Sequence, residues 1–245
     1  MRPPMFLVGE VPATGAFRLT GPEGRHAAKV RRMRVGERLE LGDGAGTIGE
    51  AVVTEVLPEG LSVAVQAVRF VAEPTPRLVV AQALAKGDRA EAAVEMMTEV
   101  GVDAIVPWAA ARSVVQWSGE RGERARARWA AHAREAAKQA SRAWVPGVEA
   151  LVDTEALTAR IENAALAVVL HESATDPLTA VPLPEVGEVL LVVGPEGGVA
   201  DEELTAFQKS GARVCRLGPE VLRTSTAGVV ALAVISARTR RWHHT

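Results

Sequence analysis

The hydrophobic pattern of this chain changes at one short segment, Ala72-Glu73-Pro74-Thr75-Pro76. The segment contains two prolines and no apolar periodicity, which is typical of a linker. Before it, the sequence predicts short strands and turns; after it, apolar strands alternate with helical segments. We therefore predict two domains, a small β domain over residues 1–72 and an α/β domain over residues 77–245.

In the first domain, partly alternating runs of apolar and polar residues predict strands. The turns Gly42-Asp43-Gly44 and Pro58-Glu59-Gly60 supply the residue types that reverse a chain between strands. A small barrel or sandwich fits this pattern best. The predicted strands are Ala16–Leu19, Arg38–Leu41, Thr47–Val56 and Leu61–Val71.

In the second domain, continuous apolar strands predict a parallel sheet that is covered on both faces, as in α/β proteins. The predicted strands are Leu78–Ala83, Ala104–Val106, Leu166–Leu170, Val189–Val193 and Val214–Leu217. The predicted helices are Asp88–Val100, Glu123–Arg142, Asp201–Ser210 and Thr224–Arg240.

The composition is that of an ordinary globular protein, with 48% hydrophobic residues, 24% charged residues and a net charge of −2. This net charge argues against a protein that coats nucleic acid indiscriminately. The single cysteine, Cys215, cannot close an intramolecular disulfide, as expected in a reducing compartment. The apolar run Phe6–Val8 is too short for a signal peptide, and no stretch reaches the roughly 18 apolar residues of a membrane span. We expect a cytoplasmic protein that does not enter a membrane.

Ligands of open α/β sheets bind at loops that follow the carboxyl ends of strands. Three such loops are Leu170-His171-Glu172-Ser173, Gly194-Pro195-Glu196-Gly197-Gly198 and the segment from Leu217 to Thr224. The second loop lacks the Lys and Ser or Thr of a P-loop, and Glu196 would repel phosphate, which excludes a nucleoside triphosphatase. No Gly-x-Gly-x-x-Gly follows the first strand, where Gln82 to Lys86 stands instead, which disfavours a dinucleotide-dependent dehydrogenase.

Taken alone, the glycine-rich loop is equally compatible with a tight strand-to-helix turn. The ordered pair of GPEGG after one strand and LGPEVLRTSTA after the next is far more specific. With these two loops the chain resembles the SPOUT methyltransferases and, within them, the RsmE family, which methylates N3 of a uridine in 16S ribosomal RNA. Further segments that carry the resemblance are His26–Arg34, Lys86–Arg89, Glu99–Val102, Arg112–Val115 and Glu135–Arg142.

This resemblance implies a PUA-like β-barrel domain followed by a parallel-sheet domain whose C-terminal part forms a trefoil knot. It also implies a homodimer with its site completed near the subunit interface, 16S ribosomal RNA in the 30S subunit as substrate, and S-adenosylmethionine (SAM) as cofactor. The implied cofactor-binding residues are Leu170, His171, Glu172, Gly194, Pro195, Glu196, Gly197, Gly198, Leu217, Gly218, Leu222, Arg223, Thr224 and Thr226.

Two positions depart from the family pattern. Ser225 stands where the family commonly has Glu, so any role of that acid is lost or moved. Val100 replaces a Leu, which is a mild core substitution. Because of Ser225, a non-catalytic ribosome assembly factor remains an alternative to the enzyme, as does a SPOUT methyltransferase that acts on another RNA site.

Uridine N3 carries a proton, so its methylation requires a base or a group that stabilises the deprotonated imide. His171 and Glu172 could act as the base, but packing beside a strand end is the commoner role for a histidine such as His171, and no base is assigned. Arg223 is the catalytic candidate, because its cation could orient RNA phosphate or stabilise imide charge. A salt bridge at a helix end is as compatible with Arg223.

A cationic cluster in the first domain contains no acidic residue and predicts a grip on RNA phosphates. A solvated surface is the alternative. The cluster consists of Arg25, Lys29, Arg31, Arg32 and Arg34. Five tryptophans could stack on bases, but burial is commoner and none is assigned to RNA; they are Trp108, Trp117, Trp129, Trp144 and Trp242. The histidines lack zinc-ligand spacing, and we expect no metal.

Overall fold

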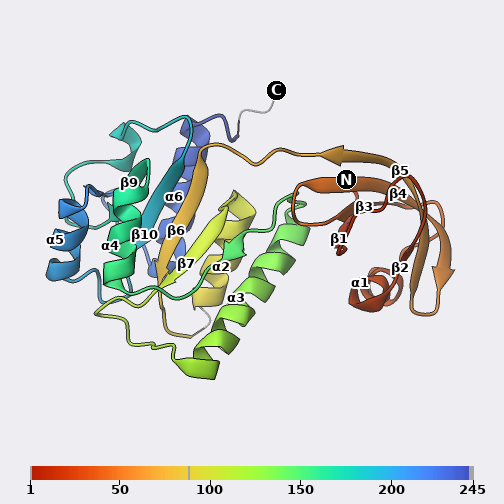
Figure 1. Cartoon of the computed structure of the whole chain (residues 1–245), viewed down its shortest axis with the longest axis horizontal. Helices are drawn as coiled ribbons and strands as arrows, with labels where there is room; N and C mark the ends of the chain where they lie inside the picture. Colours follow the sequence, from red (N-terminus) through yellow and green to blue (C-terminus); the bar gives the residue numbers. More distant parts are fainter. Residues whose placement is uncertain (1, 88, 243–245) are drawn as a thin grey trace. The chain divides into compact units, whose positions relative to one another are not determined.

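The computed structural model describes residues 2–87 and 89–242 (Figure 1). The chain forms two compact units. The first joins the chain up to Glu73 to a later segment, Ala137–Val145, and the second joins Pro74–Ala136 to the chain from Pro146 onward. The first unit is therefore built from two separate stretches of sequence.

The first unit contains one mixed sheet of five strands in the order β1-β3-β4-β5-β2. Strands β1 and β3 pair in parallel, and the other neighbours are antiparallel. All four predicted strands are present, whereas the three-residue strand β1 was not predicted. Because the five strands share one sheet, the sandwich alternative is wrong for the described residues. The strands are β1 (Met5–Leu7), β2 (Gly15–Leu19), β3 (Arg38–Gly42), β4 (Thr47–Leu57) and β5 (Gly60–Phe70).

The segment between β2 and β3 is helical, which the strand pattern did not predict. A short helix α1 (Gly21–Arg25) continues into a π-helical turn over His26–Val30. Buried Ala27 and Met33 anchor this segment in the core of the first unit. The cationic side chains that flank these two residues therefore remain on the surface.

The later segment of the first unit is tied to the sheet by backbone and side-chain bonds. The Trp144 indole N–H donates to the carbonyl of Val71 at 2.8 Å, and the Gly46 N–H donates to the carbonyl of Ala143 at 3.0 Å. Lys138, with a side chain only 6% exposed, pairs with Glu23 at 2.8 Å. These contacts complete the unit with residues that lie far from it in the sequence.

The second unit contains a six-stranded parallel sheet in the order β11-β9-β10-β6-β7-β8, of which β9, β10, β6 and β7 lie side by side in Figure 1. All neighbouring strands pair in parallel, which confirms the α/β prediction. The strands are β6 (Arg77–Ala83), β7 (Ala104–Trp108), β8 (Gly147–Val148), β9 (Leu166–Leu170), β10 (Glu188–Val193) and β11 (Arg213–Cys215).

Helices cover both faces of this sheet. Residues of α2, α3 and α6 share one core with alternate sheet residues such as Leu78 and Val80, and α4 and α5 share the other core with Val79 and Ala81. The helices are α2 (Arg89–Val100), α3 (Gly119–Gln139), α4 (Thr154–Asn163), α5 (Asp201–Lys209) and α6 (Thr224–Arg238). None of the described helices is long and apolar enough to cross a bilayer.

The predicted helices of the second unit are present with shifted ends, and α4 was missed. The predicted first residue of α2, Asp88, lies outside the described residues. Helix α3 ends at Gln139, before the predicted Arg142, because Ser141 has a positive φ of 50°. Strand β11 ends at Cys215, before the predicted Leu217, because Arg216 pairs instead with the segment that follows β9.

Candidate active site

A cleft lies at the carboxyl ends of β9 and β11, where the sequence predicted ligand-binding loops. Six of the predicted cofactor-binding residues line it: Leu170, His171, Glu172, Leu217, Gly218 and Leu222. Four further lining residues were not predicted: Arg216, Glu220, Val221 and Ala227. Residues that are far apart in the sequence thus meet at one edge of the sheet.

Backbone hydrogen bonds fix the two loops that form the cleft. The His171 N–H donates to the carbonyl of Cys215 at 3.0 Å, and the Arg216 N–H donates to the carbonyl of Asp176 at 2.9 Å. The Arg216 carbonyl accepts from the N–H of Leu178 at 2.9 Å. The loop after β9 therefore runs alongside the segment after β11 and holds it in place.

The cleft combines apolar side chains with backbone groups that are free to bind a ligand. Among the described residues, the N–H groups of Leu217, Gly218 and Leu222 have no hydrogen-bond partner. Leu170 and Ala227 add apolar surface. Free amides beside apolar walls suit the adenine and methionine parts of SAM, so the donor set fits this cofactor.

The cleft encloses about 70 Å³, well below the roughly 300 Å³ at which pockets for drug-sized ligands begin. The segment from Leu217 to Arg223, which contributes five of the lining residues, contains no helix or strand.

Hydrogen bonds of the Gln82 and Thr224 side chains connect the glycine-rich loop to the start of α6, beside the cleft. The Thr224 hydroxyl donates to the carbonyl of Gly194 at 2.8 Å and accepts from the side-chain amide of Gln82 at 3.0 Å. Gln82 is fully buried at the end of β6, and Thr224 is the first residue of α6. The ends of β6 and β10 are thereby joined to the start of α6.

The remaining residues of the glycine-rich loop contact other segments at the carboxyl edge of the sheet. Glu196 accepts from the N–H of Lys86 at 3.2 Å and lies 3.8 Å from the Arg89 guanidinium. The Arg112 guanidinium donates to the carbonyl of Gly197 at 3.3 Å. Glu196 therefore contacts Lys86 and Arg89, and Gly197 contacts Arg112. The predicted residues Pro195, Glu196, Gly197 and Gly198 do not line the cleft at the ends of β9 and β11.

The two candidate residues for proton or charge chemistry have different surroundings. The His171 ring accepts a hydrogen bond at Nδ1 from the Ser173 N–H, 3.2 Å away, so a neutral ring carries its proton on Nε2. Arg223 is exposed, and its guanidinium has no partner in the part of the chain that the structure describes. The alternative of a helix-end salt bridge for Arg223 is therefore not observed.

The two remaining predicted residues of α6 lie in its first turn. Thr226 is half-buried and donates its N–H to the Arg223 carbonyl at 2.8 Å. Ser225, which replaces the family Glu, leaves this turn without an acidic side chain. The positive end of the α6 dipole is therefore not compensated by a residue of its own first turn.

The cationic cluster of the first unit is partly neutralised by a residue from the following hairpin. Glu59 forms an ion pair with Lys29 and lies 4.0 Å from the Arg25 guanidinium, and its pKa is lowered by the hydrogen bond and charge of Lys29. Arg31, Arg32 and Arg34 are exposed, and their guanidinium groups have no partner among the described residues. These three residues, here called the free arginines, carry the unscreened charge of the cluster.

Cys215 lies at the end of β11 and is 1% exposed. Burial raises the pKa of its thiol, and the charge of Asp176 raises it further. A buried, protonated thiol is a poor nucleophile, so Cys215 acts as a residue of the core. Within the described residues, no three side chains of the types that ligate metals come together.

Sequence reasoning missed Gln82, although one signal was present. It is a polar residue at the end of a strand that is otherwise apolar, and its Oε1 is buried without a partner. A buried polar side chain at the carboxyl end of a strand is a recognisable site signal. Arg216 and Glu220 carry no comparable signal, because exposed charged residues are common in loops.

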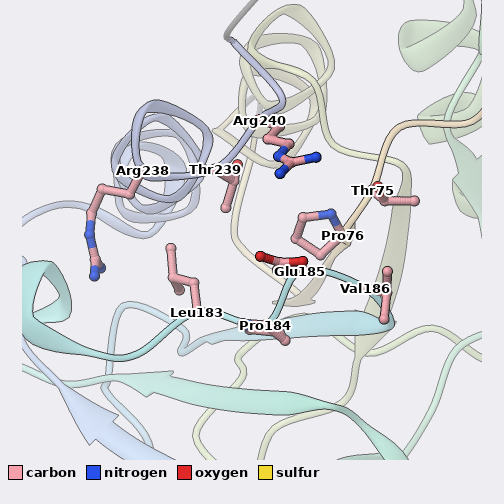
Figure 2. Close-up of a pocket in the computed structure, with 9 residues that line it drawn as sticks. All are labelled: Thr75, Pro76, Leu183, Pro184, Glu185, Val186, Arg238, Thr239 and Arg240. Carbon is pink, nitrogen blue, oxygen red and sulfur yellow. The ribbon is translucent and has the colours of Figure 1, made fainter.

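A larger groove of about 430 Å³ lies at the other end of the strands, where β6 and β10 begin (Figure 2). It is lined by Thr75, Pro76, Leu183, Pro184, Glu185, Val186, Arg238, Thr239 and Arg240. None of the predicted site residues lies there. The larger groove and the predicted site residues therefore lie at different places.

The chain matches two family models, which agree with the observed small β unit and parallel α/β sheet. The RNA methyltransferase domain model matches residues 72–236, and the RNA methyltransferase PUA domain model matches residues 19–65. The class is thus that of RNA methyltransferases with an N-terminal PUA-like domain. Within this class, the chain belongs to the ribosomal RNA small subunit methyltransferase E family, which confirms the resemblance seen in the sequence.

Two relatives support this assignment over nearly the whole chain. Ribosomal RNA small subunit methyltransferase E of Mycobacterium bovis is 44% identical over 243 residues, covering 97% of this chain and 93% of the relative. The protein of the same name from Bacillus subtilis is 31% identical over 231 residues, covering 91% of this chain and 90% of the relative.

Solved structures show the same fold. A methyltransferase of Legionella pneumophila, in complex with bound SAM, is 29% identical, has a TM-score of 0.86 and covers 98% of this chain and 99% of its own. Ribosomal RNA small subunit methyltransferase E of Neisseria gonorrhoeae, also bound to SAM, has a TM-score of 0.85 and is 23% identical, covering 97% of this chain and 98% of its own. The second likeness bears on the fold alone.

Proposed function

We propose that this protein transfers a methyl group from SAM to N3 of a uridine in 16S ribosomal RNA of the 30S subunit. One observation carries the proposal: in a member of this family, the predicted loops after β9 and β11 form one cleft at the carboxyl edge of the sheet. The glycine-rich loop after β10 is joined to the same place through Thr224.

SAM, when bound, supplies a methyl group on a positively charged sulfur, which is open to in-line attack. The free N–H groups of Leu217, Gly218 and Leu222 hold the cofactor, and Leu170 and Ala227 pack against it. The SAM-bound Legionella relative supports SAM as the cofactor. Most of the rate then comes from positioning, because methyl transfer from a sulfonium needs an aligned nucleophile and little else.

In this proposal, the chain stabilises the negative charge that forms on the uridine. N3 becomes nucleophilic only when it loses its proton, and a nearby cation stabilises the negative imide that remains. We assign this role to Arg223, which stands at the start of α6 next to Leu222 of the cleft and has no competing ion pair among the described residues.

We also propose that the C-terminal part of the chain is threaded as a trefoil knot. The segment between β11 and α6 is bonded on one side to the loop after β9, through Arg216 and Asp176. On the other side Thr224 is bonded to Gly194 and Gln82. A segment held between two earlier parts of the chain is what such threading requires.

The remaining parts of the proposal concern the whole protein. Residues 1–72 act as the PUA-like RNA-binding domain, with the cationic cluster on RNA phosphates, and residues 77–245 act as the methyltransferase domain. The protein works as a homodimer in the cytoplasm. Family membership supports the homodimer, and the free arginines support the RNA contact.

The test uses methyl-tritiated SAM and 30S subunits that lack the uridine methylation. After digestion of the RNA to nucleosides, we expect label in 3-methyluridine. Label in another nucleoside would instead identify a different RNA site. Absence of both label and SAM binding in calorimetry would favour a non-catalytic assembly factor.

The role of Arg223 is tested with Arg223→Ala, and Arg240→Ala is the matched control because Arg240 is also an exposed arginine without a partner among the described residues. Loss of one group that stabilises developing charge lowers kcat by about 100-fold or more. We expect that loss for R223A and parental kcat for R240A. Equal kcat of both variants would remove Arg223 from the chemistry.

A further inference from the structure

A second hollow lies at the same edge of the parallel sheet as the cleft. It has a volume of about 280 Å³ and is bounded by the loop after β6, the start of α2 and the segment that leads into α3. Its walls include Leu84, Gly87, Val115 and Trp117, and its rim includes Glu91 and Arg128. The proposed reaction assigns no role to it.

Trp117 and Trp129 are the aromatic residues that line this hollow, and Trp117 is the more exposed of the two. Trp117 is half-buried and packs edge-on against Trp129, with ring centroids 4.9 Å apart and an interplanar angle of 75°. Trp129 is 1% exposed, so it belongs to the core and holds the Trp117 ring in place. A partly exposed aromatic ring that is fixed by its neighbours loses little side-chain entropy when a ligand stacks on it.

The backbone of Trp117 is fixed as well. A Cβ placed on Gly122, in the first turn of α3, would lie 3.1 Å from the Trp117 Cβ, so the helix is packed directly against this residue. The ring is therefore presented by a helix and a core residue, although Trp117 itself lies in a loop.

The rim of the hollow carries one positively charged and one negatively charged side chain. The Arg128 Nε lies 2.9 Å from a carboxylate oxygen of Glu91, whose side chain is 16% exposed. The Arg128 side chain is 63% exposed, so its outer N–H groups face solvent. A nucleobase has a flat π-face and an edge of donors and acceptors, and this hollow matches both features.

The hollow is connected to the proposed cofactor site by a loop. Glu196 of the glycine-rich loop accepts from the N–H of Lys86, which lies between Ala85 and Gly87 of the hollow. Helix α2, whose first turn lines the hollow, packs against α6, whose first residue is Thr224. A nucleotide held in the hollow is thus on the side of the sheet where methyl transfer is proposed.

We propose that this hollow binds an unpaired base of the RNA substrate, stacked on Trp117. The proposal rests on the proposed function for the identity of RNA as the ligand. Sequence-specific RNA binding commonly uses unstacked bases that lie on aromatic side chains. Trp117, which the sequence alone left without a role, is then the residue that holds the RNA near the cofactor.

The test compares Trp117→Phe with Trp117→Leu. Phe keeps a π-face, whereas Leu fills apolar space without one. Base stacking is worth about 1–3 kcal/mol per base, which corresponds to an affinity loss of about 5- to 150-fold. We expect W117L to bind unmethylated 30S subunits that much more weakly and W117F to stay near the parent, with unchanged SAM affinity in both.

Trp242→Leu serves as the matched control, because Trp242 is 47% exposed and lies outside the hollow. Parental 30S affinity of W117L, alongside intact methylation by the parent, would overturn the base site and leave the proposed function standing. A parent that binds 30S subunits without methylating them, while W117L binds weakly, would overturn the reaction and support the base site. If W117L and W117F weaken 30S binding equally, the ring is not a stacking surface.

Discussion

At the scale of single residues, the Thr224 side chain joins three elements of the candidate site, the ends of β6 and β10 and the start of α6. It is 7% exposed, and its hydroxyl both donates to Gly194 and accepts from Gln82. Removing a buried hydroxyl leaves its partners unsatisfied, and that penalty is larger than the net gain of an ordinary hydrogen bond. Thr224 therefore stabilises the geometry of the site as well as the fold.

We predict that Thr224→Val lowers the free energy of unfolding by about 1–3 kcal/mol, because the Gly194 carbonyl loses its Thr224 donor and the buried Gln82 amide keeps only its longer bond, to the Ala83 carbonyl at 3.3 Å. Thr224→Ser keeps the hydroxyl and is the matched control. Urea unfolding monitored by circular dichroism measures the change. Val keeps the methyl group and loses the hydroxyl, whereas Ser keeps the hydroxyl and loses the methyl group, so an equal loss in both variants would show that the hydroxyl alone does not explain the effect. No loss in T224V would show that the hydrogen bonds of the Thr224 hydroxyl contribute nothing.

At the scale of elements, the loop after β11 is the part of the cleft that a substitution can probe without strain. A Cβ on Gly218 would have only a carboxylate oxygen of Glu220 nearby, at 3.5 Å, and its φ is not in the left-handed region. In contrast, a Cβ on Gly194 would lie 2.9 Å from a methyl group of Val199. A substitution at Gly218 can therefore change ligand binding without straining the fold, whereas a substitution at Gly194 would also strain the fold.

We predict that Gly218→Val weakens SAM binding by about tenfold or more, since the added atoms enter the cleft, which corresponds to at least about 1.4 kcal/mol. Its unfolding free energy should stay within about 0.5 kcal/mol of the parent. Gly147→Val is the control, because Gly147 is also open to solvent with no atom within 4 Å of an added Cβ. Calorimetry with SAM decides: unchanged affinity in G218V places the cofactor elsewhere.

The elements also show what the sequence can and cannot predict. The long apolar strands such as Val189–Val193 were predicted because every position is buried, and the loops that follow them were found by the same logic. The short β1 and the π-helical turn over His26–Val30 were missed, because neither is long enough to show a period. The ion pair of Glu59 with Lys29 joins residues of different elements, which no local pattern reveals.

At the scale of the whole molecule, charge is distributed unevenly on a nearly neutral protein. The net charge is −2, yet the free arginines carry three positive charges without partners among the described residues. Such a local concentration attracts RNA phosphates even though the protein as a whole does not. Arg25 and Lys29 contribute less to this field, because Glu59 lies next to both.

We predict that replacing Arg31, Arg32 and Arg34 together with Glu weakens binding to 30S subunits and leaves SAM affinity unchanged. Each lost phosphate contact should reduce the slope of log affinity against log salt by about 0.7–0.9. Arg25→Glu with Lys29→Glu is the comparison, and we expect a smaller slope change for it. Identical slopes of the triple variant and the parent across a salt titration would show that the free arginines do not contact RNA.

The path of the chain between the two units sets an order of events during synthesis. The first unit takes its final contacts from Ala137–Val145, which is translated only after the strands β6 and β7 of the second unit. On a translating ribosome, the N-terminal strands therefore lack these contacts until part of the second unit has emerged. Each unit consists of two stretches of sequence, so no contiguous fragment contains all the contacts of either unit. A single cut in the chain would therefore not yield two complete units.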